Sequence, residues 1–259
     1  MPWLFPILAY LVGSIPFGVL LARSRGIDIR AHGSGNVGAT NVFRVVGRNF
    51  GIACLILDFL KGFVPVALAT NLLRITGVSP AIPIPFLWEF TTELAPDQQL
   101  HLHSLHVITA LAAIMGHNYS VFLRGRGGKG IATSAGVLVA LMPLVLLGGM
   151  AVFATTFFFS RLVSLSSILA ALSLPIFCHL FDRIRHVDGD QSQPTLWEAG
   201  AWNKPLMVFA LVTCSLAVWR HRANIQRILA GTEDRLTSRP RNPPPSPPDS
   251  PRENSNHES

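Results

Sequence analysis

The sequence is poor in charge, in cysteine and in tyrosine. Charged residues make up 14% of its 259 residues, and it has only three Cys and two Tyr. A soluble globular domain usually carries about 25% charged residues. Together with a hydrophobic content of 49%, this shortage excludes an ordinary soluble enzyme and favours a membrane protein.

The scarce cysteines also exclude a disulfide scaffold and a zinc framework, because all three lie within apolar runs and lack metal-ligand spacing. His101, His103 and His106 lie closer together, but they fall in a segment that we expect on the outer side of the membrane. We therefore predict no metal site and no cofactor.

The net charge of +7 would suit a nucleic-acid-binding protein, but the basic residues cluster between apolar runs. Lys and Arg gather in this way in the cytoplasmic loops of membrane proteins. We therefore predict no nucleic-acid partner, and we use the basic loops to orient the chain.

Six apolar stretches are candidate membrane crossings. Residues 3–22 carry no charge and are long enough to cross a hydrocarbon core of ~30 Å. Because basic residues follow this stretch and do not precede it, we expect a retained first span and no cleaved signal peptide. Residues 131–160 form the longest uncharged stretch. The other four are residues 50–73, 104–123, 162–181 and 205–219.

The basic loops decide how the longest stretch is divided. The loops 23–49 and 124–130 and the segment after Trp219 are basic and therefore expected in the cytoplasm. An even number of crossings must then separate residue 131 from Trp219. If residues 131–160 form one span, the number of crossings is odd, whereas a break near Pro143 or Gly148-Gly149 makes it even. Each half of the stretch would then be only ~22 Å long and would need local membrane thinning.

The sequence therefore predicts an all-α integral membrane protein with seven transmembrane helices, its N-terminus outside and its C-terminus cytoplasmic. Residues 1–236 would form the membrane domain. Residues 237–259 are rich in Pro and Ser and lack apolar periodicity, so we predict a disordered cytoplasmic tail.

The first basic loop combines glycines with small polar side chains in the run His32–Asn41 (HGSGNVGATN). Glycine lets backbone N–H groups close on an anion, and Arg44 would share a helical face with Asn41. The alternative is a glycine-rich turn that caps the next helix. The candidate ligands are Ser34, Gly35, Asn36, Gly38, Thr40 and Asn41.

The second basic loop, residues 124–134 (RGRGGKGIATS), resembles a nucleotide P-loop only superficially. A P-loop needs Ser or Thr directly after its Lys and a strand before it, whereas Gly130 follows Lys129 here. A simpler phosphate cradle fits better, and an ordinary basic loop is the alternative. The candidate ligands are Gly127, Gly128, Lys129, Gly130 and Thr133.

Two further patterns place polar groups in apolar surroundings. Asp58 and Lys61 share one face of an apolar span. Such a pair indicates either a functional site or a structural ion pair that stabilises the helix bundle. Lys61 could also extend its amine towards the phosphate site. After Trp219, the periodicity predicts an amphipathic helix at the membrane surface, with His221 and Asn224 on its apolar side.

Three motifs in order resemble those of the acyl-phosphate-dependent glycerol-3-phosphate 1-acyltransferases, which are bacterial integral membrane enzymes of phospholipid synthesis. The resemblance spans about residues 4–236. Its motifs are Ser34–Asn41 with Arg44, then Gly116-His117 leading to Gly127–Thr133, then His221 and Asn224 with Gly231-Thr232-Glu233.

This resemblance implies transfer of a fatty acyl group from acyl phosphate to the 1-hydroxyl of glycerol 3-phosphate. The products would be 1-acyl-glycerol 3-phosphate (lysophosphatidic acid) and phosphate, made on the cytoplasmic face of a bacterial inner membrane. Membrane lipid and the enzyme that makes acyl phosphate are further candidate partners. The resemblance and the chemistry assign catalysis to Ser34, Arg44, Lys129, His221 and Asn224. They add Lys61 to the candidate phosphate ligands of the two loops, and they give structural roles to Asp58 and Glu233.

The proton of the attacking hydroxyl would pass either to His221 or to an oxygen of the acyl phosphate, and the sequence leaves both open. Two other classes share parts of the pattern. A transporter for an organophosphate anion usually has an internal repeat, and none is evident. A scaffold that binds anionic lipid would not need Ser, Asn and Thr at fixed positions.

Overall fold

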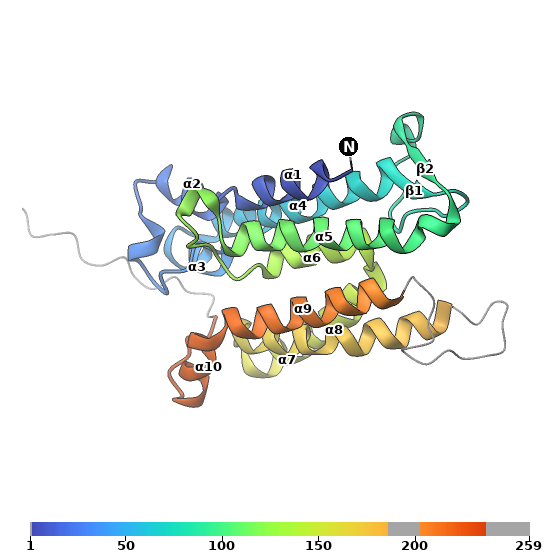
Figure 1. Cartoon of the computed structure of the whole chain (residues 1–259). Coiled ribbons are helices and arrows are strands. Elements are labelled where there is room, and N and C mark those ends of the chain that lie inside the picture. Colours follow the sequence, from blue (N-terminus) through green and yellow to red (C-terminus); the bar gives the residue numbers. More distant parts are fainter. Residues whose placement is uncertain (1, 186–202, 237–259) are drawn as a thin grey trace, which may run out of the picture.

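The structure, a computed structural model, describes residues 2–185 and 203–236 and is a bundle of long helices (Figure 1). The predicted tail, 237–259, lies outside the described residues. The long elements are α1 (Leu4–Ser14), α4 (Arg48–Leu72), α5 (Gln99–Asn118), α6 (Ile131–Leu141), α7 (Pro143–Ser160), α8 (Val163–Arg185) and α9 (Asn203–Arg220). The short ones are α2 (Phe17–Arg23), η1 (Ile29–Ala31), α3 (Ala39–Val45), β1 (Leu73–Ile75), η2 (Pro85–Phe90), β2 (Thr92–Leu94), η3 (Pro96–Gln98), η4 (Val121–Leu123) and α10 (Arg222–Leu229).

The predicted helical class is confirmed. Within the described residues, five helical segments are long and apolar enough to cross a membrane. A sixth qualifies if α9 and α10, which meet at a bend of 57°, are counted as one span. The seventh expected span is α6, which has 11 residues and is therefore about 17 Å long, well short of a hydrocarbon core of ~30 Å.

Proline residues divide two of the predicted spans. The break expected in 131–160 lies at Pro143, the first residue of α7, and not at the glycine pair. Proline suits a first helical position because the N–H group that it lacks would have no partner there. The stretch 3–22 is also divided, because α1 ends at Ser14 and α2 begins after Pro16. The sequence reading did not anticipate this second break.

Glycines allow the closest helix crossings. Gly13 of α1 and Gly116 of α5 face each other's helix backbone, and Gly62 of α4 and Gly136 of α6 do the same. A Cβ atom at any of these positions would overlap the facing backbone, so only glycine permits such an approach. Helices α1, α4, α5 and α6 form one group, and α7, α8 and α9 pack beside it (Figure 1).

The two ends of the bundle differ. At one end β1 and β2 form a parallel pair, with Leu73 opposite Thr92, which the sequence analysis did not predict. Arg74 and Glu93 join the two strands through an ion pair of 2.6 Å. Helices α2, α3 and α10 lie at the opposite end (Figure 1). The glycine-rich loops therefore meet α10 at that end.

Candidate active site

A cavity of about 430 Å³ lies at the end of the bundle that carries α3 and α10. Three segments line its polar side, namely residues 33–44, 129–132 and 221–234. Apolar side chains from the long helices complete the wall. These are Leu55 of α4, Phe153 of α7 and Val163 of α8. The cavity thus joins polar loops to partly exposed apolar side chains of the long helices.

Asn41 shapes the first loop. Its side chain is 2% exposed, and its amide nitrogen donates to the backbone carbonyls of Ile29, His32 and Asn36. Its amide oxygen accepts a hydrogen bond from the backbone N–H of Ser34 at 3.0 Å. Since both ends of the amide are occupied, Asn41 organises the loop around the cavity and has little capacity left for a ligand.

Arg220 shapes the second loop in a similar way. Its guanidinium donates to the backbone carbonyls of Gly127 and Gly128 at 2.6 to 3.0 Å. Gly130 then adopts a φ of +79° at the N-cap of α6, a conformation that favours glycine. The amine of Lys129 and the N-terminal turn of α6 therefore meet at the cavity, and both attract anions.

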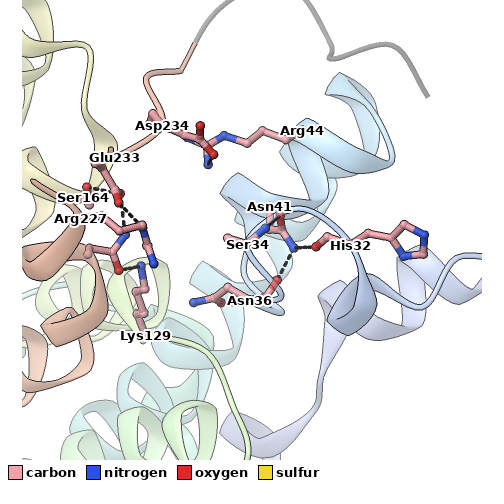
Figure 2. A network of polar contacts seen from close by, with 11 residues as sticks. His32, Ser34, Asn36, Asn41, Arg44, Lys129, Ser164, Arg227, Glu233 and Asp234 are labelled. Atoms are coloured by element: carbon pink, nitrogen blue, oxygen red, sulfur yellow. Dashed lines mark hydrogen bonds and ion pairs between the residues drawn. The ribbon is translucent and has the colours of Figure 1, made fainter. Parts of the chain in front are cut away.

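A chain of hydrogen bonds connects this loop to α8 and α10 (Figure 2). Lys129 Nζ donates to Asn224 Oδ1, and Asn224 Nδ2 donates to Glu233 Oε1, each at 2.6 Å. Ser164 of α8 donates to the same carboxylate oxygen at 2.6 Å. Arg227 Nε binds the other oxygen at 2.7 Å. Glu233 thus holds together parts of the chain that are distant in sequence.

The first loop lies across the cavity from this chain of hydrogen bonds (Figure 2). Arg44 donates to the backbone carbonyl of Asp234 at 2.9 Å, which ties α3 to the segment after α10. The amide oxygen of Asn36 accepts from the N–H of Gly38 at 2.9 Å. The Asn36 amide nitrogen points towards the side on which Lys129 lies (Figure 2). Donors therefore approach the cavity from two opposite sides.

Burial and neighbouring cations tune the charged groups. Burial is the main cause that lowers the pKa of Lys129 to about 8, and Arg227, Arg44 and Arg220 lower it further, against the opposing effect of Glu233. Burial alone would raise the pKa of Glu233, but hydrogen bonds from its three partners outweigh burial and hold that pKa below its usual range. At neutral pH, Lys129 is therefore a cation and Glu233 an anion.

His221 also lines the cavity and lies at the bend between α9 and α10. Its Nδ1 atom lies 2.7 Å from the carbonyl oxygen of Ala217. A carbonyl only accepts hydrogen bonds, so Nδ1 carries the proton of the neutral ring and Nε2 keeps a lone pair. This tautomer gives the site one candidate proton acceptor.

The structure brings most of the predicted site residues to the cavity. All five residues assigned to catalysis line it, and so do Asp58 and Glu233, which were expected to be structural. Of the predicted phosphate ligands, those that line it are Asn36, Gly38, Thr40, Asn41 and Gly130. Those that do not are Gly35, Lys61, Gly127, Gly128 and Thr133.

Lys61 is held behind the cavity wall. Its amine lies 2.7 Å from Asp58 Oδ1 and donates to the carbonyl of Ile15 at 2.8 Å. That carbonyl lies at the break between α1 and α2. The side chains of Lys61 and Asp58 are only 4% and 3% exposed. The pair therefore stabilises the crossing of α1 and α4, and Asp58 alone reaches the cavity wall.

Sequence reasoning assigned no role to four residues of this site, although His117 stood in one of the quoted motifs. Arg227 and Ser164 bind Glu233, and Arg220 holds the second loop. His117 lines the cavity, and its ring packs against Gly128. The three-residue spacing of Asn224 and Arg227 could have placed both on one face of a helix. Nothing in the pattern around Ser164 separates it from other serines in apolar helices.

The cavity combines three cationic side chains, those of Arg44, Lys129 and Arg227, with the start of α6. It also contains the Nε2 lone pair of His221 and an apolar wall. Together these features define a class of site. Such a cavity binds phosphate groups on its polar side and hydrocarbon on its apolar side. Its shape suits a membrane enzyme that acts on a phosphorylated, lipid-like substrate. Within residues 2–185 and 203–236, no group of three or more His, Cys, Asp or Glu side chains gathers as a metal site would require.

Comparison with known proteins identifies the family. The model of the glycerol-3-phosphate acyltransferase family matches residues 3–231. The glycerol-3-phosphate acyltransferase of Geobacter sulfurreducens is 39% identical, over 88% of this chain and 94% of that protein. The one of Aquifex aeolicus is 37% identical, over 89% of this chain and 96% of that protein. The chain therefore belongs to the glycerol-3-phosphate acyltransferase family and is an acyltransferase.

The fold agrees with this assignment. A crystal structure of PlsY, an integral membrane glycerol 3-phosphate acyltransferase in its glycerol 3-phosphate form, is 35% identical. It aligns with a TM-score of 0.68 over 91% of this chain and 96% of that one. Its lysophosphatidic acid form aligns with a TM-score of 0.66. The chain is therefore an integral membrane protein, as the sequence predicted.

Proposed function

We propose that this acyltransferase moves a fatty acyl group from acyl phosphate to the 1-hydroxyl of glycerol 3-phosphate. The products are 1-acyl-glycerol 3-phosphate and inorganic phosphate. The observation that carries the proposal is the meeting of Arg44, Lys129 and His221 around one cavity with an apolar wall. A relative in this family has been crystallised in glycerol 3-phosphate and lysophosphatidic acid forms, which supports both the acceptor and the product.

The reaction needs two phosphate groups near each other, and their repulsion must be offset. Arg44 and Lys129 approach the cavity from opposite sides, so each is suited to neutralise one phosphate. The start of α6 adds backbone N–H groups beside Lys129. Positioning of this kind lowers the barrier because the reacting groups no longer have to meet from solution.

The hydroxyl oxygen of glycerol 3-phosphate attacks the carbonyl carbon of the acyl phosphate, and the bond from that carbon to the phosphate oxygen breaks. The electron pair leaves with the phosphate. His221 Nε2 takes the hydroxyl proton, since Nδ1 is held by Ala217. Donors from the first loop, such as the Asn36 amide, stabilise the oxyanion that develops on the carbonyl oxygen.

We also propose that the chain crosses a bacterial inner membrane seven times, with α6 as a short crossing, and that the cavity opens to the cytoplasm. The basic loops lie at the same end of the bundle as the cavity, which agrees with the enrichment of Lys and Arg on the cytoplasmic side. Residues 1–236 would form the membrane domain, and the tail would be cytoplasmic. Membrane lipid and the enzyme that makes acyl phosphate are its proposed partners.

Purified enzyme in lipid vesicles, mixed with palmitoyl phosphate and radiolabelled glycerol 3-phosphate, tests the donor. We expect labelled lysophosphatidic acid and one phosphate released per acyl group transferred. Palmitoyl-coenzyme A at the same concentration is the matched donor control and should give little product. A preference for the thioester would overturn the proposed donor, and no product from either would overturn the proposed reaction.

A further inference from the structure

A second and larger cavity, of about 780 Å³, lies along α2, shares no lining residue with the active-site cavity and is called the α2 groove. Its floor is apolar and its rim is basic. The floor consists of Ile15, Pro16, Val19, Leu20, Phe122 and Leu123. The rim consists of Arg23, Arg30, Arg124 and Arg126, and no acidic residue is among the described residues that line the groove.

We propose that the α2 groove binds an anionic phospholipid, with the headgroup phosphate at the arginine rim and the acyl chains on the apolar floor. This site is separate from the one in which acyl transfer is proposed, and it does not depend on that function. A soluble anion would match the rim alone, whereas a phospholipid matches both surfaces. The arginines match the charge of any phosphate, and the apolar floor beside them favours a lipid over a free phosphate.

The rim has spare positive charge. Arg30 is occupied by Asp28, to which its Nε and Nη2 atoms donate at 2.9 and 2.8 Å. No carboxylate pairs with Arg23, Arg124 or Arg126 within the described part of the chain. Guanidinium groups bind phosphate oxygens through paired hydrogen bonds. These three arginines therefore form the expected headgroup contacts.

The floor is accessible from the side of the bundle. The side chains of Leu20 and Phe122 are 50% and 59% exposed, on helices that begin or end at the basic end of the molecule. Apolar residues beside clustered arginines at this level match the boundary between hydrocarbon and headgroups, where anionic lipids attract basic segments. The acyl chains can therefore enter the groove directly from the membrane.

The groove is closed off from the active site. A small cavity of about 10 Å³ lies between them, sharing Ile15 and Leu123 with the groove and Asp58 and His117 with the active-site cavity. Such a space holds one water molecule at most, and the buried Lys61 side chain lines it. An acyl chain cannot pass, so the ligand of the groove is not a substrate on its way to the reaction.

Native mass spectrometry of the intact protein released from nanodiscs tests the proposal. The discs contain equal amounts of dioleoyl-phosphatidylglycerol and dioleoyl-phosphatidylcholine, which differ only in the headgroup. We expect one retained phosphatidylglycerol, preferred at least ~10-fold over phosphatidylcholine, the size of effect that several charge-assisted hydrogen bonds produce. Soluble glycerophosphoglycerol should not displace it, whereas displacement would show a site for a free phosphate and overturn the lipid proposal.

A matched pair of variants locates the site. The groove variant carries Arg23→Gln, Arg124→Gln and Arg126→Gln, and the control carries Arg25→Gln, Arg48→Gln and Arg235→Gln, which removes the same charge outside the groove. We expect the groove variant alone to retain phosphatidylglycerol and phosphatidylcholine equally. An unchanged preference in the groove variant, or equal loss in the control, would overturn the proposal. Unfolding temperatures identify a variant that fails to fold, and Leu20→Glu then tests the floor with the rim intact. This variant should lose the retained phosphatidylglycerol, and unchanged retention would overturn the proposal.

Discussion

Lys129 Nζ donates a hydrogen bond of 2.6 Å to Asn224 Oδ1, although 95 residues separate the two. An ammonium group can only donate and the Glu233 carboxylate can only accept, so the Asn224 amide has one orientation that satisfies both. Its oxygen faces the lysine and its nitrogen the carboxylate. The amide thereby keeps Lys129 apart from Glu233, and the lysine charge remains available for a substrate phosphate.

The first prediction concerns the two cations. Arg44→Ala or Lys129→Ala should lower kcat/KM by at least ~100-fold, about 2.7 kcal/mol, because each removes one of the charges that offset phosphate repulsion. Steady-state kinetics with glycerol 3-phosphate as the varied substrate measures this. Arg25→Ala is the control, since Arg25 is exposed and lies outside the cavity. Near wild-type kinetics in both alanine variants would contradict the assignment.

The second prediction concerns pH. Burial lowers the pKa of Lys129 to about 8, so the amine loses its charge as the pH rises through that value. Since the charged form binds phosphate, kcat/KM should be highest below about pH 8 and fall above it. The Lys129→Arg variant should have a lower kcat/KM, because a guanidinium crowds the glycine loop. Its kcat/KM should nevertheless stay constant up to pH 10, since the guanidinium keeps its charge. A flat wild-type profile would contradict this role of Lys129.

The third prediction concerns Arg220 as a positioning residue. Arg220→Lys should lower kcat at least ~10-fold, about 1.4 kcal/mol, because an ammonium group cannot hold the carbonyls of Gly127 and Gly128 together as the guanidinium does. Arg222→Lys is the matched control, since Arg222 stacks on Trp219 and is exposed. If the loop is displaced in Arg220→Lys, the pH at which kcat/KM falls, which we assign to Lys129, should shift as well. Equal effects in both variants would argue against positioning.

The fourth prediction concerns membrane orientation. The backbone N–H of Leu236 donates to the carbonyl of Arg161 at 3.0 Å, so the α7–α8 connection and the segment after α10 lie on the same side. In a chain without its native cysteines, Arg161→Cys should react with an impermeant maleimide only from the cytoplasm. Asp97→Cys, at the opposite end, should react only from outside. The reverse pattern would disprove the proposed orientation.

The fifth prediction concerns the reaction path. We expect direct attack and no acyl-enzyme, because within the described residues Asn41 holds the Ser34 backbone N–H and no base is hydrogen-bonded to the Ser34 hydroxyl. Enzyme incubated with palmitoyl phosphate alone should show no added mass of a palmitoyl group, and kinetics should be sequential. A palmitoyl ester trapped on Ser34 would establish that residue as a nucleophile.

Composition and charge pattern were sufficient to predict the class of protein and the outline of the site. Uncharged stretches of about 20 residues can bury their backbone polar groups in lipid only as helices, so composition predicted the helical membrane fold. Basic residues beside glycines marked the two loops that line the cavity. The motifs of Ser34, Lys129 and His221 carried the resemblance to the family because they lie in short, contiguous runs.

Which side chains meet at the site depends on the packing of the folded bundle. By its charge Lys61 is a candidate phosphate ligand, yet Asp58 and the carbonyl of Ile15 hold it behind the cavity wall. Ser164, in α8, acts on the site because Glu233 folds back onto it from beyond α10. Periodicity gives the face of one helix, but a contact between helices depends on how closely they pack and where each one ends. That information resides in the assembled bundle.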